Sequence, residues 1–129
     1  MAEKVHFVSS DTTEAKAAAA RMRDVYGDHD IKAADAVVAL GGDGLMLETL
    51  HEVLQMNIPV YGMNFGSIGF LMNSFGEEDL LDRLAQAIPT VIHPLKMTVV
   101  NQRGEVHSAL AFNEVSVFRS TFQAAKIRV

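Results

Sequence analysis

The chain has 129 residues, 49% of them hydrophobic, which is enough for one domain with a substantial core. A formal net charge of −5 argues against a general nucleic-acid surface, and no apolar run approaches the ~20 residues of a membrane span, so we expect neither partner. The absence of cysteine excludes disulfides, thiolate zinc sites and cysteine nucleophiles, and it is compatible with a reducing cytoplasm, where we expect the protein to act. The five histidines are scattered without i, i+4 pairing, so no metal site is predicted from them.

The first part of the chain alternates between strand-like and helical patterns. A short strand is predicted over Val5–Val8, and a helix over residues 12–26. Asp11 and Glu14 have the spacing of a capping box at the start of this helix. The predicted inward face of the helix is a stripe of mostly small residues: Ala15, Ala18, Ala19, Met22 and Tyr26.

The uninterrupted apolar run Ala36–Leu40 predicts a buried strand of the kind found in parallel sheets. A helix is predicted from near Leu45, and a further strand over Val60–Met63. A third helix is predicted over Glu77–Ile88. The expected inward stripe of the second helix is Leu47, Leu50, His51 and Leu54. The expected inward stripe of the third helix is Leu80, Leu81, Leu84 and Ile88.

The pattern changes near residue 90, where helical periodicity ends. Strands are predicted over Lys96–Val100, Glu105–Ala111 and Glu114–Phe118, with a hairpin turn at residues 101–104. We therefore expect an α/β nucleotide-binding domain over residues 1–90 and the beginning of a β-rich domain over residues 91–129. A small sheet with one missing half cannot bury both faces, so we expect the chain to be cut short of its natural end.

The tetrapeptide Gly41-Gly42-Asp43-Gly44 lies between the buried strand and the second predicted helix. Such a turn directs backbone amides and the positive end of a helix at whatever binds there, which suits a phosphate. A carboxylate repels phosphate, so Asp43 needs another role: holding Mg²⁺, or taking a proton from an attacking hydroxyl. The simpler alternative is a strand-to-helix turn with an aspartate as N-cap.

Two further clusters carry candidate site residues. The segment from Gly62 to Leu71 has the spacing G-x-x-x-G-x-x-G, which differs from the dinucleotide fingerprint. It is either the wall of a nucleotide pocket, with Phe70 lying against a base, or a turn whose Ile68, Phe70 and Leu71 fill the core. Asn113 and Glu114 could together bind a base edge and a ribose diol, or could be a turn between strands.

Taken in order, the three clusters resemble the NAD kinases. That family carries GGDG after a strand, an N-x-G-x-x-GFL segment after the next strand, and an Asn-Glu pair at the start of a β-rich domain. GGDG alone also occurs in 6-phosphofructokinases and in lipid kinases, but the ordered set is far more specific. The resemblance covers the whole chain, and the short first domain is similar to the bacterial branch. It implies a Rossmann-like, phosphofructokinase-like three-layer domain followed by the start of a β-sandwich-like domain.

The resemblance implies transfer of the γ-phosphoryl group of ATP, or of polyphosphate, to the 2′-hydroxyl of the adenosine ribose of NAD. Mg²⁺ or another divalent cation would accompany ATP, and the protein would be a homodimer or homotetramer. Asp43 matches the general base of the family. The remaining implied NAD contacts are Gly44, Leu47, Phe70, Asn113 and Glu114, and Gly41 and Gly42 would lie near phosphate.

Two departures from the family pattern stand out. Most members have threonine after GGDG, whereas this chain has Leu45, so one hydroxyl contact is lost. The family's glycine- and threonine-rich phosphate loop would follow Val129, so we expect residues 1–129 alone to have little or no kinase activity. The alternatives are a related kinase with a lipid or sugar-phosphate acceptor, and a nucleotide-binding module without catalysis.

Overall fold

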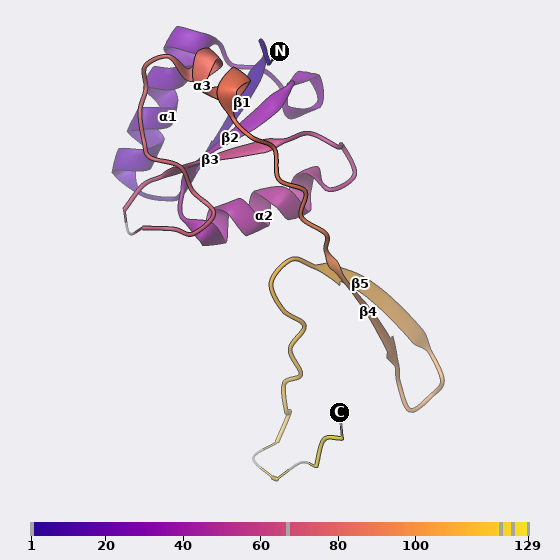
Figure 1. Ribbon diagram of the computed structural model, residues 1–129. Helices are drawn as coiled ribbons and strands as arrows, with labels where there is room; N and C mark the ends of the chain where they lie inside the picture. Colours follow the sequence, from indigo (N-terminus) through magenta and orange to yellow (C-terminus); the bar gives the residue numbers. More distant parts are fainter. Residues whose placement is uncertain (1, 67, 122, 125, 129) are drawn as a thin grey trace. The chain divides into compact units, whose positions relative to one another are not determined.

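The computed structural model describes residues 2–66, 68–121, 123–124 and 126–128. The chain divides into two compact units, Met1–Ile92 and His93–Val129, and each is described by itself (Figure 1). The first unit is an α/β arrangement of helices on a parallel sheet, and the second contains an antiparallel hairpin.

The sheet of the first unit contains β1 (Val5–Ser9), β2 (Ala36–Gly41) and β3 (Val60–Asn64), in that spatial order and all parallel. All six residues of β2 are buried, because the strand has a neighbour on each edge and helices on both faces. This confirms the predicted buried strand. Parallel strands place their carboxyl ends at one edge of the sheet, so the segments that follow β2 and β3 begin side by side.

Helix α1 (Thr13–Tyr26) packs against β1 and β2 through the predicted stripe. Its three stripe alanines and Met22 are buried, and Tyr26 is partly buried against the same core. The N-cap is Thr12, whose hydroxyl accepts a hydrogen bond from the Ala15 amide, so the expectation that Asp11 begins a capping box was wrong. Asp11 instead forms an ion pair with Lys16. A 3₁₀ turn, η1 (Ile31–Ala33), leads into β2.

Helix α2 (Asp43–Val53) lies on the opposite side of the sheet from α1 (Figure 1). It buries Met46, Thr49 and Val53, whereas His51 is exposed, so the predicted leucine stripe was wrong. The buried stripe includes Thr49, whose hydroxyl donates to the Leu45 carbonyl at 2.7 Å. That hydrogen bond lets a polar residue face the sheet without leaving an unpaired group.

Helix α3 (Leu80–Gln86) is shorter than the predicted helix at both ends. Asp79 has a left-handed conformation with φ of 53°, which prevents the helix from extending back to Glu77. Ala87 is extended, and the proline at position 89 disfavours helical geometry in the residue before it. Leu80 and Leu84 pack on the core as expected, whereas Ile88 is 90% exposed, which contradicts its inward placement.

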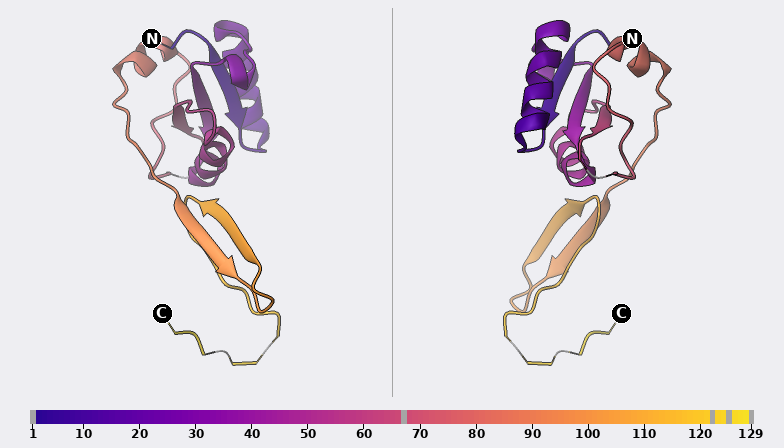
Figure 2. Two further views of the ribbon diagram at one scale, coloured as in Figure 1. Left: turned by 90° about the vertical axis from the view of Figure 1, so that its right-hand side faces the viewer. Right: turned by 90° about the vertical axis from the view of Figure 1, so that its left-hand side faces the viewer.

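The second unit contains β4 (Leu95–Val100) and β5 (Val106–Ala111), which pair antiparallel (Figure 2). The predicted turn is confirmed: the Gly104 amide donates to the Asn101 carbonyl at 2.9 Å, and Gly104 has a φ of 80°. Glu114–Phe118 was predicted as a strand but has no strand conformation. Among the described residues no strand lies beside it to accept and donate ladder hydrogen bonds.

Candidate functional site

The GGDG turn connects the carboxyl end of β2 to the start of α2. Gly41 ends the strand, Gly42 is the N-cap of the helix, and Asp43 is the first helical residue. The cap has no side-chain hydrogen bond, so the alternative in which Asp43 merely caps α2 is wrong. The carboxylate of Asp43 is therefore at the helix N-terminus for another reason.

The three glycines of the turn differ in their surroundings. A β-carbon built on Gly41 would lie 2.7 Å from Leu45 Cδ2 and 3.3 Å from Ser10 Cβ, so glycine is needed there for packing. At Gly42 and Gly44 a β-carbon would have no neighbour within 4 Å, and neither residue has a positive φ. A glycine without such a reason costs about 0.5–1 kcal/mol relative to alanine inside a helix, where Gly44 lies.

The carboxylate of Asp43 binds the second glycine segment. Its Oδ2 accepts a hydrogen bond from the Phe70 amide, and its Oδ1 accepts one from the Leu71 amide, both at 2.9 Å. A β-carbon built on Gly69 would lie 2.6 Å from Asp43 Oδ1. The two glycine clusters of the sequence thus meet at one carboxylate.

The second glycine segment is also fixed to the sheet. The Phe65 amide donates to the Gly41 carbonyl at 2.8 Å, which extends the pairing of β2 with β3 by one step. The segment then returns beside β3, where the Asn64 amide donates to the Asn73 carbonyl at 2.7 Å. The Gly69 amide donates to Asn64 Oδ1 at 3.0 Å. The carboxylate of Asp43 therefore faces a loop that is anchored on both sides.

The apolar side chains of this segment point to solvent. Ile68 is 95% exposed, Phe70 is 100% exposed and Leu71 is 38% exposed, so the alternative in which they fill the core was wrong. Phe70 holds Asp43 through its backbone while its ring stays free. Leu47, the other residue expected beside a base, is half-buried on α2.

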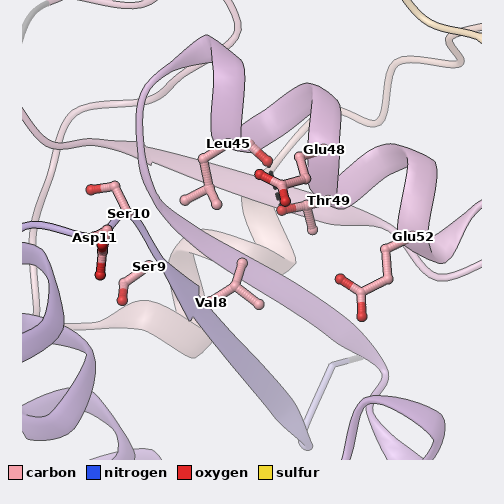
Figure 3. Close-up of a pocket in the computed structure, with 8 residues that line it drawn as sticks. All are labelled: Val8, Ser9, Ser10, Asp11, Leu45, Glu48, Thr49 and Glu52. Carbon is pink, nitrogen blue, oxygen red and sulfur yellow. Dashed lines mark hydrogen bonds between the residues drawn. The ribbon is translucent and has the colours of Figure 1, made fainter.

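A cleft of about 460 Å³ lies on the other side of the turn, between the carboxyl end of β1 and α2 (Figure 3). Its polar lining includes the side chains of Asp11, Glu48 and Glu52. The ion pair with Lys16 holds the pKa of Asp11 below its usual range, so this carboxyl stays charged. The acidic lining makes this cleft an unfavourable place for a phosphate. A second cleft, of about 450 Å³, is lined by Asn64, Ile68, Gly69, Met72, Asn73, Ser74 and Phe75.

Asn113 and Glu114 lie in the second unit, separated from the end of β5 by one residue, and both are exposed. The structure thus brings Asp43 together with Phe70 in the first unit and places the Asn-Glu pair in the other. The bonds between Asp43 and the amides of Phe70 and Leu71 were not predicted from the sequence. The signal that could have revealed them is that both glycine clusters follow neighbouring parallel strands.

Within the described ranges, no three or more histidine or acidic side chains are arranged to hold a metal ion. In the same part of the chain, no helix combines the length and apolar character needed to cross a bilayer.

Comparison with known proteins bears on this arrangement. The profile of a family described as the ATP-NAD kinase N-terminal domain matches residues 1–109. The chain belongs to the NAD kinase family. Both glycine clusters of the site lie inside the matched residues, and the Asn-Glu pair lies just beyond them.

Curated relatives support the same family. An NAD kinase of Rhizobium meliloti is 50% identical over 123 residues, which are 95% of this chain and 48% of the relative. An NAD kinase of Caulobacter vibrioides is 49% identical over 98% of this chain and 48% of its own length. One of Xanthomonas oryzae is 47% identical over 98% of this chain and 50% of its own length. The chain thus spans about half the length of these relatives.

Proposed function

We propose that this chain is the N-terminal half of an NAD kinase of the bacterial type, with a Rossmann-like, phosphofructokinase-like first domain. The reaction transfers the γ-phosphoryl group of ATP, or of polyphosphate, to the 2′-hydroxyl of the adenosine ribose of NAD and yields NADP. The protein would act in the cytoplasm as a homodimer or homotetramer. Family membership and the names of the relatives support this reaction.

The observation that carries the proposal is the open space around Gly42 and Gly44 beside the carboxylate of Asp43. The fold needs no glycine at these positions, since a β-carbon would touch nothing. A ligand bound at the turn would explain the two glycines, because the lack of a side chain lets the ligand approach the backbone amides at the helix N-terminus. Among ligands, one with a phosphate and a nearby hydroxyl uses both the amides and the carboxylate.

In this proposal Asp43 is the general base. The carboxylate accepts the proton of the ribose 2′-hydroxyl as its oxygen attacks the γ-phosphorus. A new O–P bond forms, and the bond between the γ-phosphorus and the bridging oxygen breaks, so that ADP leaves. Each carboxylate oxygen accepts one hydrogen bond from a loop amide and can accept a second from the hydroxyl. A divalent cation would accompany ATP, as Mg²⁺ commonly does when it binds nucleotide phosphates.

The NAD contacts are proposed to extend beyond Asp43. The exposed ring of Phe70 offers a face on which an adenine can stack, and Leu47 would line the same side. The exposed amide and carboxylate of Asn113 and Glu114 would bind the adenine amine and the ribose. Gly44 would approach the nucleotide through its backbone.

The test is the variant Asp43→Asn in the full kinase, compared with Asp24→Asn, which makes the same change on the exposed surface of α1. Loss of the base is expected to lower kcat by roughly 10²–10⁴-fold, and NAD affinity by calorimetry should change far less. Asp24→Asn should behave as wild type in both assays. Substantial NADP formation by Asp43→Asn would rule out the base role.

A further inference from the structure

Three successive backbone amides of the second glycine segment are bound by side-chain oxygens. Asn64 accepts from Gly69, and Asp43 accepts from Phe70 and Leu71. We propose that Asn64 and Gly69 are positioning residues, which hold this segment so that its amides fix the direction of the Asp43 carboxylate. The inference rests on the proposed function, in which that carboxylate is the base.

Gly69 is needed for close approach rather than for backbone conformation. Its φ is not in the left-handed region, so alanine fits the backbone there. A β-carbon, however, would lie 2.6 Å from Asp43 Oδ1 and 2.8 Å from Met72 Cγ, closer than such atoms approach in folded proteins. Gly66 is the opposite case, with a φ of 95° and no neighbour within 4 Å. Only the glycine at position 69 leaves room for the carboxylate.

Asn64 is a fixed reference point for the segment. It is the last residue of β3 and lies opposite Gly41, the last residue of β2, in the parallel register. Asp43 follows Gly41 by only two residues. Asn64 and Asp43 therefore lie at the same end of neighbouring strands. Because the Gly69 amide is bound to Asn64 Oδ1, the next two amides of the segment, those of Phe70 and Leu71, lie opposite the Asp43 carboxylate.

The two amides fix the orientation of the Asp43 carboxylate but do not use all of its hydrogen-bond acceptor positions. A carboxylate has about four acceptor positions, and the two amides use one on each oxygen. The other acceptor positions of the carboxylate remain available for a hydroxyl. Because a misplacement of about 1 Å can lower a rate by ~10²-fold, small shifts of this loop should appear in kcat.

The first experiment measures Gly69→Ala in the full kinase. We expect kcat to fall by roughly 10²-fold, with the NAD dissociation constant changed only a few-fold and the unfolding midpoint close to wild type. The double variant Gly69→Ala/Met72→Ala removes the second close contact and should remain slow, because the clash with Asp43 persists. Wild-type kcat in Gly69→Ala, or full rescue by the Met72 change, would overturn the inference.

The second experiment does not depend on activity. Amide hydrogen exchange at Gly69, Phe70 and Leu71 is compared among wild type, Asn64→Leu and Asn64→Asp. The leucine has similar size but no acceptor, and loss of a hydrogen bond worth ~1.4 kcal/mol should speed exchange about 10-fold. The aspartate keeps an oxygen and should retain protection. Unchanged exchange in Asn64→Leu would refute the positioning role, whereas a wild-type protein that cannot phosphorylate NAD would refute only the proposed function.

Discussion

Replacing Met22 by alanine tests how α1 is held on the sheet. Met22 is 1% exposed and belongs to the core cluster that includes Phe7 and Leu80. The other fully buried residues of α1 are alanines, so Met22 supplies most of the fully buried apolar volume on that helix face. Truncation of a buried methionine to alanine costs about 2–5 kcal/mol, and we expect about 3 kcal/mol because the fully buried α1 residues beside it are alanines, which cannot fill the cavity.

The assay is urea unfolding followed by helical circular dichroism, which reports the first unit because all helices described lie there. The matched control is Val25→Ala, three residues further along α1, where the side chain is 73% exposed. It should change the unfolding free energy by no more than about 0.5 kcal/mol, and towards stability, since alanine is the better helix former. Equal losses in the two variants would show that Met22 does not hold the helix.

Two contacts between α1 and the segment before α3 give further predictions. Tyr26→Phe removes a hydroxyl that donates to the Glu77 carbonyl at 2.6 Å and accepts from the Leu80 amide at 3.3 Å, and should cost about 1–3 kcal/mol in urea unfolding; a wild-type midpoint would contradict this. The hydrogen-bonded ion pair with Arg21 lowers the pKa of Glu77, so its stabilising effect is present above the usual glutamate range and is lost as the pH falls through the lower, folded-state value. The difference in unfolding midpoint between wild type and Glu77→Gln should therefore shrink as the pH falls from 7 towards about 3, and a growing difference would contradict the assignment.

Local patterns predicted the elements whose surroundings are simple. The continuous apolar run over β2 predicted a fully buried strand, and the alanine stripe of α1 predicted its inward face. The inward face of α2 could not be predicted in this way, because a hydrophobic stripe was expected and Thr49 occupies it after satisfying its hydroxyl within the helix. Periodicity measures side-chain polarity and does not detect an internal hydrogen bond.

The sequence predicted which residues belong to the site, but not which of them contact one another. The glycine clusters located the turn and the loop, yet Asp43 was expected to act alone at a helix terminus. Its bonds to Phe70 and Leu71 depend on the meeting of segments 27 and 28 residues apart, which no local pattern records. The exposure of Phe70 is also a tertiary property, since the same sequence suits a residue that fills a core.

The position of β2 has a consequence for synthesis. This uncharged, β-prone strand pairs with β1, which precedes it, and with β3, which lies about twenty residues later in the chain. During translation one edge of β2 therefore stays unpaired until Val60–Asn64 has left the ribosome. An open edge on an apolar strand invites association with other nascent chains. Fast elongation through residues 42–64 would shorten the time for which the edge of β2 is unpaired. A chaperone bound to the strand would shield the edge during that time.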